Sequence, residues 1–252
     1  MIIDRPTKTQ ISMLGRIWRE AFDDGDFFDD VFLKTTFSCD RCRCLMLDGE
    51  IAAALYWFDC TCRGEKIAYL YAIATAKKHR NKGLCKSLMN DTHRHLKSLG
   101  YKGALLVPGS AELFGFYEKI GYRRCTTVSE FECDAKGKGI NIKRIGREEY
   151  AALRRQYLPD GAVIQEGESL DLLETQASFF AGDDFLMAAE IDDGRLLCTE
   201  LLGDKDAAPA ILTALGCRSG SFRTVGDGKD FAMYLPLDDG CLKPEYFGLA
   251  FD

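Results

Sequence analysis

A short basic loop carries the residue spacing that points most directly to chemistry, Arg80-x-x-Gly83-x-Cys85. It joins a predicted strand to a predicted amphipathic helix, so the glycine stands at a helix N-terminus. Unpaired N–H groups and partial positive charge gather there, and glycine lets a phosphate approach the backbone. More positive charge comes from nearby lysines, Lys77, Lys78, Lys82 and Lys86. The loop predicts a pyrophosphate site, although a capped, solvated helix start gives a similar pattern.

The composition restricts the classes of function. The chain has 252 residues, 46% of them hydrophobic, and a formal net charge of −6. A negative chain lacks the basic face that nucleic-acid binding requires. No apolar run approaches the roughly 20 residues that span a membrane, and the first residues do not resemble a signal peptide. We therefore expect a cytoplasmic protein that binds neither nucleic acid nor membrane.

Eleven cysteines raise the question of a metal. The densest group is Cys39-x-x-Cys42-x-Cys44, with Cys60-x-Cys62 following. Asp48-Gly49 predicts a hairpin turn between the two groups. If Leu47 faces Glu50 across that turn, Cys44 faces Ala53, and the two cysteine groups lie at different heights. A tetrahedral zinc site is then disfavoured, so we expect reduced thiols packed on strands and no metal.

The remaining pattern predicts a mixed α/β (α+β) fold of two similar domains. In the first, helices are expected at 8–22, 26–36, 83–99 and 112–120, and strands at 1–5, 41–47, 51–61, 66–75, 104–107 and 122–133. In the second, helices are expected at 147–157, 168–179 and 206–215, and strands at 140–145, 185–191, 196–202, 220–225, 230–236 and 246–252. The glycine-rich joint after residue 134 predicts domains at 1–134 and 135–252.

The second half lacks the basic loop. It has Gly203-Asp-Lys-Asp-Ala-Ala208 at the corresponding place, and Asp204 and Asp206 would repel a pyrophosphate. We therefore expect a degenerate copy that binds no nucleotide there. Two unrelated segments with the same element order are the alternative.

A second motif follows one helix and one strand after the loop, Phe114-Gly-Phe-Tyr117-Glu-Lys-Ile-Gly-Tyr122. Together with Ile73-Ala-Thr-Ala-Lys-Lys-His-Arg-Asn-Lys-Gly, it resembles the GCN5-related N-acetyltransferase (GNAT) family over residues 1–133. The chain resembles more specifically the tandem-domain members of the enhanced-intracellular-survival type. Cys85 departs from the family pattern, which has glycine or alanine there. The resemblance implies a GNAT fold with a central mixed, mostly antiparallel sheet flanked by helices, followed by a degenerate GNAT-like domain.

The resemblance also implies a site for acetyl-CoA. The backbone of Ile73, Ala74 and Thr75 would pair with the pantetheine arm, and Tyr117 would place its hydroxyl near the thioester sulfur. Ser110 and Phe116 would lie near the adenine-to-pantetheine end of the site. The pyrophosphate would be held by amides of the loop residues Arg80, Asn81, Lys82, Gly83, Leu84 and Cys85.

The expected activity is transfer of an acetyl group from acetyl-CoA to a primary amine of a small molecule or a protein, by direct attack in a ternary complex. Transfer needs a neutral amine, a donor for the oxyanion at the Ile73 or Ala74 N–H, and a proton for the leaving thiolate, from Tyr117. A core tyrosine is the alternative role for Tyr117. A non-catalytic acyl-CoA sensor or interaction module is the alternative function, and succinyl-CoA or malonyl-CoA is an alternative donor.

The base and the acceptor are not identified by spacing. Asp26, Asp59 and Glu112 are candidate bases, as are a water chain and the Asp252 carboxylate. The acidic, aromatic run 23–30 could concentrate a cationic amine, but a solvated loop explains it as well. His93 has no evident partner and is expected on an exposed helix face. The sequence leaves a homo-oligomer open.

Overall fold

The computed structural model describes residues 1–22, 24–240 and 242–251, and the chain divides into two compact units. The first contains Met1–Arg123, Gly167–Leu172 and Met233–Leu242, and the second contains Arg124–Glu166, Leu173–Ala232 and Lys243–Asp252. Neither unit is a continuous stretch of sequence. The domain boundary at residue 134 remains a prediction.

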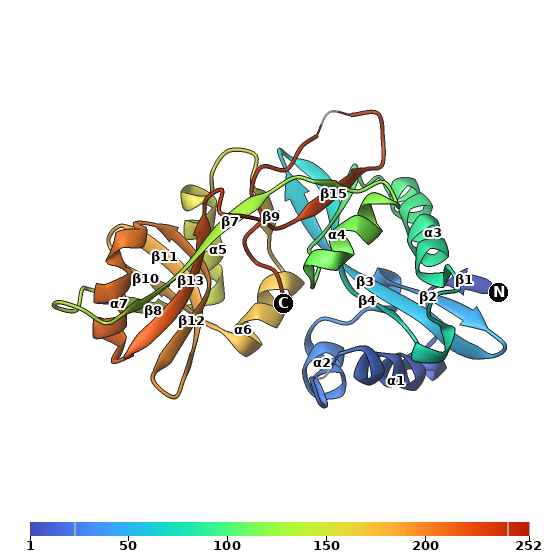
Figure 1. Cartoon of the computed structure of the whole chain (residues 1–252), viewed down its shortest axis with the longest axis horizontal. Helices are drawn as coiled ribbons and strands as arrows, with labels where there is room; N and C mark the ends of the chain where they lie inside the picture. The colour runs from blue at the N-terminus through green and yellow to red at the C-terminus, as the bar shows by residue number, and fades with distance from the viewer. Residues whose placement is uncertain (23, 241, 252) are drawn as a thin grey trace. The chain divides into compact units, whose positions relative to one another are not determined.

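A mixed, mostly antiparallel sheet forms the centre of the first unit, as predicted (Figure 1). Its strands follow the order β1-β2-β3-β4-β5-β15-β6. The pairs from β1 to β4 and the pair β5–β15 are antiparallel, whereas β4 and β5 are parallel. The bounds are β1 Ile2–Asp4, β2 Cys42–Leu47, β3 Glu50–Cys62, β4 Glu65–Thr75, β5 Gly103–Leu106, β6 Arg123–Arg124 and β15 Met233–Pro236.

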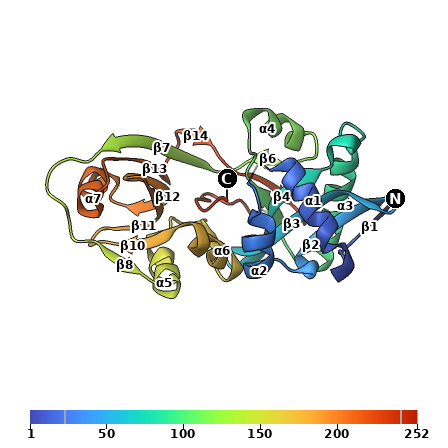
Figure 2. The same ribbon diagram turned by 90° about the horizontal axis from the view of Figure 1, so that it is seen from below.

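Helices cover both faces of this sheet because side chains of β3 alternate between them. Tyr56 contacts the Trp18 ring of α1 at 5.5 Å, whereas Leu55 and Trp57 join the core that Leu96 of α3 completes. Figure 2 shows α1 and α2 in front of these strands. Helix bounds are α1 Ile11–Ala21, α2 Leu33–Thr35, α3 Leu84–Ser98 and α4 Ala111–Glu118, with a π-helical turn at Phe28–Phe32. No helix of the described residues is long and apolar enough to span a membrane.

The second unit repeats this arrangement around a sheet ordered β14-β7-β13-β12-β11-β10-β8. Only β12 and β13 are parallel, and α7 connects them as α3 connects β4 and β5. The strands are β7 Thr127–Asp134, β8 Lys143–Ile145, β10 Ser178–Ala181, β11 Phe185–Asp192, β12 Arg195–Gly203, β13 Ser219–Val225 and β14 Lys229–Asp230. The other elements are β9 Val163–Gln165, α5 Arg147–Tyr157 and α7 Ala208–Leu215. The helix α6, Glu168–Gln176, is divided between the two units at Leu172.

Several predicted elements differ from the structure. The strand predicted at 122–133 is two strands, β6 and β7, in different sheets. The helix predicted at 168–179 ends at Gln176, because Phe179 and Phe180 are both buried on the strand β10. The strand predicted at 230–236 is two strands, β14 and β15, in different sheets. The strand predicted at 246–252 is absent among the described residues 246–251, where Tyr246 forms a single parallel bridge with Ala162.

The predicted register of the first hairpin was wrong by one residue. Leu47 faces Glu50 as expected, but Cys44 faces Ala54 instead of Ala53, since a β-bulge at Ala52 adds a residue to β3. The cysteines described in the structure are free thiols. Within the described ranges, no three His, Cys, Asp or Glu side chains are placed to hold a metal ion.

A buried ion pair holds the second unit together. The Arg154 guanidinium of α5 donates to both oxygens of Glu200 on β12, at 2.6 and 2.9 Å. The Tyr150 and Tyr246 hydroxyls donate to the same carboxylate at 3.0 and 3.1 Å. Glu200 is fully buried and Arg154 is 2% exposed. Four bonds therefore compensate the desolvation of one carboxylate.

Replacing Arg154 by Met should destabilise the protein by about 3–5 kcal/mol, because Glu200 is left buried without its counter-ion. The neighbouring Arg155 offers a matched control, since it pairs with Glu166 at 2.5 Å on the exposed surface. Arg155→Met should cost at most about 1 kcal/mol. Urea unfolding followed by far-UV circular dichroism measures both, and equal costs would contradict the prediction.

Candidate active site

The strand β4 separates from its parallel neighbour β5 partway along its length. The two strands pair only from Ile67 to Tyr69. Against β3, the register places Ala54 opposite Ala74 and Tyr56 opposite Tyr71, so Ala72 and Ile73 form a bulge. Ala72 has a φ of +47°, a conformation that is strained for a residue with a side chain. Beyond the bulge, the β5-facing edge of β4 has no strand beside it in the described part of the chain.

The basic loop ends where α3 begins, as predicted. Gly83 has a φ of +75°, and nothing lies within 4 Å of the position that a Cβ would occupy. The N–H of Ser87 donates to the Gly83 carbonyl at 3.1 Å and starts the bonding within the helix. The preceding N–H groups of Leu84 and Cys85 therefore point out of the helix end.

The side chains of the loop are exposed, and two of them stabilise the loop by hydrogen bonds to nearby backbone carbonyls. Asn81 has a left-handed φ of +60°. Arg80 Nε donates to the Thr75 carbonyl at 3.1 Å, and Lys82 Nζ donates to the Lys78 carbonyl at 3.0 Å. Lys78 also forms an ion pair with Glu50. The loop thus presents positive charge and free N–H groups beside the open edge of β4, which together suit a phosphate.

The Cys85 thiol lies behind the loop and is held as a thiol. Burial raises its pKa to about 11, and a hydrogen bond with Thr75 lowers it in part. Protonated sulfur is a poor nucleophile and a poor metal ligand, so Cys85 acts as a small packing residue here.

The second motif is a helix ending with a defined geometry. The Tyr122 N–H donates to the Tyr117 carbonyl at 3.1 Å, and the Gly121 N–H donates to the Glu118 carbonyl at 3.0 Å. Gly121 has a φ of +113°. These bonds form a Schellman motif, whose usual apolar contact is here the edge-to-face packing of the Tyr117 and Tyr122 rings at 5.9 Å. The spacing Tyr-x-x-x-Gly-Tyr therefore fixes Tyr117 at the last turn of α4.

Several predicted site residues meet around one apolar core. Tyr117 is 7% exposed and belongs to this core, and Ile73, Leu84, Cys85 and Phe116 pack against it. Burial raises the pKa of Tyr117, and the Cys85 sulfur adds to the effect.

The Tyr117 hydroxyl forms no hydrogen bond with any described residue, and it is therefore available to a ligand. Ser110 caps α4 on the exposed surface without a side-chain bond and does not join this core.

His93 is a residue that sequence reasoning misplaced. We expected it on an exposed helix face, but it is 8% exposed, and its Nε2 lies 2.8 Å from the Tyr122 hydroxyl. Burial lowers its pKa to about 4, with a smaller effect of Arg94. The spacing Cys85, Met89, His93 places the three on one face of α3, and this was the signal available in the sequence.

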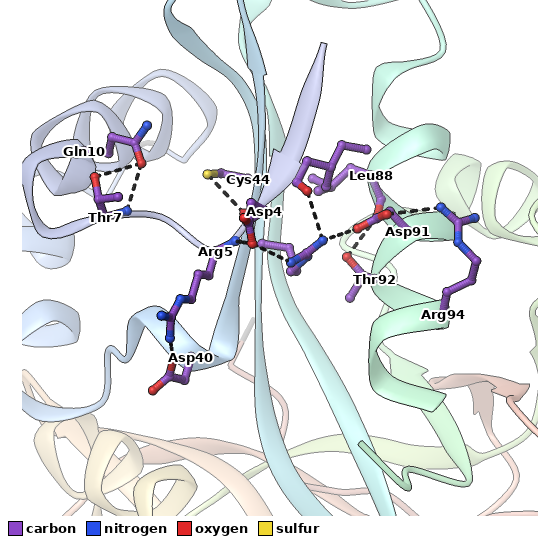
Figure 3. Close-up of polar contacts among 12 residues, drawn as sticks. Asp4, Arg5, Thr7, Gln10, Asp40, Cys44, Leu88, Asp91, Thr92 and Arg94 are labelled. Atoms are coloured by element: carbon purple, nitrogen blue, oxygen red, sulfur yellow. Dashed lines mark hydrogen bonds and ion pairs between the residues drawn. The ribbon is translucent and has the colours of Figure 1, made fainter. Parts of the chain in front are cut away.

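A buried arginine anchors α3 to the edge of the sheet. Arg43 of β2 donates to the Asp4 carboxylate and the Ile3 carbonyl, each at 3.1 Å, and to the Asp91 carboxylate of α3 (Figure 3). Asp91 also pairs with Arg94 at 3.1 Å. The position of α3, and with it the basic loop, is thus fixed by charge as well as by packing.

Aromatic side chains gather on the opposite face of the sheet near the bulge. Trp18 packs edge-on against Tyr71 at 5.8 Å and donates from its Nε1 to Asp24 at 2.7 Å. Burial raises the pKa of Tyr71, and Asp24 adds to this. Asp24 and Asp26 are exposed, and Asp23 lies outside the described residues.

The structure does not single out a base. Asp59 accepts from the Tyr101 hydroxyl and lies opposite Ala68, before the opening of the sheet. Glu112 and Asp26 are exposed, and Asp252 lies outside the described residues.

The second unit is closed at the corresponding place. Its parallel strands pair from Arg195 to Cys198 and, after a shift in register, again at Leu201, where Thr224 Oγ1 donates to the Leu201 carbonyl at 2.8 Å. The Asp204 carboxylate accepts a hydrogen bond from the Asp206 N–H at 2.9 Å, so this N–H of the turn before α7 already has a partner within the turn.

Comparisons with known proteins agree with this geometry. Residues 3–125 match the family model described as an acetyltransferase (GNAT) domain. No curated protein matches the chain in sequence. A GCN5-related N-acetyltransferase from Kribbella flavida has a TM-score of 0.72 at 17% identity, over 94% of this chain and 72% of its own.

Two further solved structures are similar. A GCN5-related N-acetyltransferase from Anabaena variabilis has a TM-score of 0.75 at 14% identity, over 94% of this chain and 73% of its own. Eis1 from Mycobacterium abscessus has a TM-score of 0.69 at 14% identity, over 94% of this chain and 74% of its own. The chain therefore shares their fold over nearly its whole length, as expected for a tandem arrangement.

The buried His93 should make stability depend on pH. Its folded pKa of about 4 lies below the usual value of about 6.5, so the unfolded chain binds the proton more readily. Neutral His93 contributes roughly 3 kcal/mol to the free energy of unfolding. This contribution is fully present above pH ~6.5 and is lost as the pH falls to about 4. Urea unfolding of wild type and His93→Gln from pH 7 to 4 measures it. Parallel curves for the two proteins would contradict the assignment.

Proposed function

Because residues 3–125 form an acetyltransferase (GNAT) domain, we propose that the protein moves an acetyl group from acetyl-CoA to a primary amine. The domain identifies the protein as an N-acetyltransferase. The main observation in favour of acetyl-CoA is the opening of the sheet between β4 and β5, beside the basic N-terminus of α3. Backbone groups along β4, free N–H groups at α3 and an unbonded tyrosine hydroxyl lie around that opening.

The residues fit an acyl-CoA. Gly83 leaves open space over the turn, and the N–H groups from Asn81 to Cys85 and the adjacent lysine charges suit a pyrophosphate. The Arg80 N–H already donates to the Lys77 carbonyl at 3.3 Å. The unpaired edge of β4 at Ile73, Ala74 and Thr75 suits the amides of a pantetheine arm, in the manner of an added strand.

Acetyl-CoA supplies an acyl group activated as a thioester. In our proposal, the N–H of Ile73 or Ala74 stabilises negative charge that develops on the acyl oxygen. Tyr117 donates a proton toward the departing sulfur, and its raised pKa keeps the hydroxyl protonated until then. The acceptor amine loses its proton to water or to a carboxylate at the mouth of the site.

We propose a cationic acceptor, on the evidence of Asp24. Trp18 holds this carboxylate near Tyr71, beside the β4 bulge, and the neighbouring residue Asp26 adds negative charge. Such a surface concentrates ammonium groups. A small polyamine and a lysine side chain share this chemistry, and an amine panel would separate them.

The second domain, proposed at residues 135–252, is in our view a GNAT-like copy without a nucleotide site. Its parallel pair remains closed, and aspartates occupy the turn before α7. A non-catalytic acyl-CoA sensor is the alternative function. Thiol release from acetyl-CoA across the amine panel distinguishes the two, since a sensor would bind the cofactor without turnover.

Coenzyme A should stabilise the protein against heat. At 100 times its dissociation constant, a ligand adds about 2.7 kcal/mol. Gly83→Ala should weaken this binding by about tenfold, because a Cβ enters the space that the phosphate would use. Gly64→Ala is the matched control, with a φ of +79° and equally open surroundings at the β3–β4 turn. Absence of a shift with acetyl-CoA, succinyl-CoA and malonyl-CoA would overturn the proposal.

Tyr117→Phe should lower kcat by roughly a hundredfold and leave the KM for acetyl-CoA and the thermal stability nearly unchanged. The hydroxyl has no bond to lose in the folded protein. Tyr101→Phe is the control, because that tyrosine belongs to the same core but bonds to Trp57 and Asp59. Thiol release at saturating acetyl-CoA measures kcat, and an unchanged value for Tyr117→Phe would remove it from the mechanism.

A further inference from the structure

We propose that His93 and Tyr122 are positioning residues that hold the Tyr117 hydroxyl in place relative to the cofactor helix α3. The inference rests on the proposed function and extends it to two buried residues that do not reach the opening of the sheet themselves. Three contacts carry it, one between α3 and Tyr122 and two between Tyr122 and Tyr117.

The contact between α3 and Tyr122 is a single buried polar bond. His93 Nε2 lies 2.8 Å from the Tyr122 hydroxyl, and the two residues are 8% and 2% exposed. Their ring centroids lie 5.5 Å apart. The surroundings are otherwise apolar, with the fully buried Met89 one turn earlier on the same face of α3. Rotating either ring would leave a buried polar group without a partner, so one relative position of α3 and Tyr122 is strongly preferred.

Tyr122 is in turn joined to Tyr117 by backbone and by ring. The Tyr122 N–H closes the Schellman motif on the Tyr117 carbonyl at 3.1 Å. The two rings pack edge to face at 5.9 Å. A shift of Tyr122 therefore moves the last turn of α4 and the tyrosine on it.

The helices α3 and α4 contribute different parts of the proposed site, so their relative position has to be fixed. The N-terminus of α3 carries the predicted phosphate loop, and α4 carries the predicted proton donor. His93 is on α3 eight residues after Cys85, whose sulfur is close enough to Tyr117 to influence its pKa. Apolar packing alone lets helices slide by fractions of an ångström, whereas a bond of 2.8 Å is directional. Small displacements of catalytic groups reduce rates strongly.

The test combines variants of His93 and Tyr122 with the Tyr117→Phe background. His93→Leu and Tyr122→Phe should each lower kcat about tenfold, equivalent to about 1.4 kcal/mol of activation free energy. The KM for acetyl-CoA and the thermal shift with coenzyme A should stay close to wild type. The double variant should lose no more than either single variant, and His93→Gln should recover most of kcat because its amide can bond to the Tyr122 hydroxyl. With Phe at position 117, none of these changes should lower kcat further.

Thr92→Val is the matched control for damage to α3. Thr92 is fully buried on the same helix, and its hydroxyl donates to the Leu88 carbonyl at 2.9 Å, a bond within α3 (Figure 3). It should leave kcat unchanged even where it lowers the thermal stability as much as His93→Leu does. Equal losses of kcat for His93→Leu with Tyr or Phe at position 117 would overturn the inference, as would an unchanged kcat in His93→Leu.

A second readout separates this inference from the proposed function. The NMR signals of the Tyr117 ring, assigned from the Tyr117→Phe spectrum, should shift or broaden in His93→Leu and stay in place in Thr92→Val. Unchanged ring signals in His93→Leu would overturn the positioning role even if no amine supports thiol release. If only the proposed function is wrong, no amine should support turnover, but the Tyr117 ring signals should still change in His93→Leu.

Discussion

The site depends on one constraint, the obligation of every backbone N–H and C=O group to find a partner. In the first unit, β4 pairs with β5 only as far as Tyr69 and bulges at Ala72 and Ile73, and among the described residues no strand lies beside the edge beyond Tyr69. Such an edge has a high affinity for any extended ligand that offers amide groups. The basic loop and the α3 N-terminus follow this part of β4 in the chain, and Ile73, Leu84 and Cys85 pack against the core that contains Tyr117.

The second unit shows what happens when the same strand pattern closes. Its β12 carries a bulge at Thr199, since Ala188 faces Glu200 whereas Ala189 faces Cys198. Glu200 follows the bulge, and its carboxylate accepts hydrogen bonds from Arg154, Tyr150 and Tyr246. A strand irregularity that produces an open edge in one unit is therefore filled by a buried charged network in the other. A network with every bond made is rigid, and it leaves nothing for a ligand to bind.

The sequence was informative where a motif is local. The loop before α3 and the Tyr117 motif each span a few residues, and their geometry follows from glycine φ values and helix ends. The sequence did not indicate contacts between residues that are far apart in the chain. His93 was expected to be exposed because its partner Tyr122 lies 29 residues away, on an element whose position depends on the fold. The hairpin register failed for a related reason, because a bulge at Ala52 leaves no sign in hydrophobic alternation.

The path of the chain links the two units during folding. After β6 the chain enters the second sheet as β7, and it reaches the first sheet beside β5 as β15, where Met233 faces Leu106. The two crossing segments are themselves paired, with the Cys125 N–H donating to the Ala232 carbonyl at 3.0 Å.

Until residues 233–236 are in place, β5 has an open edge next to the core that holds Tyr117. A contact between segments more than 120 residues apart forms late, because its loop-closure entropy must be overcome first. The sheet of the first unit is therefore completed by residues that follow strands of the second sheet in sequence.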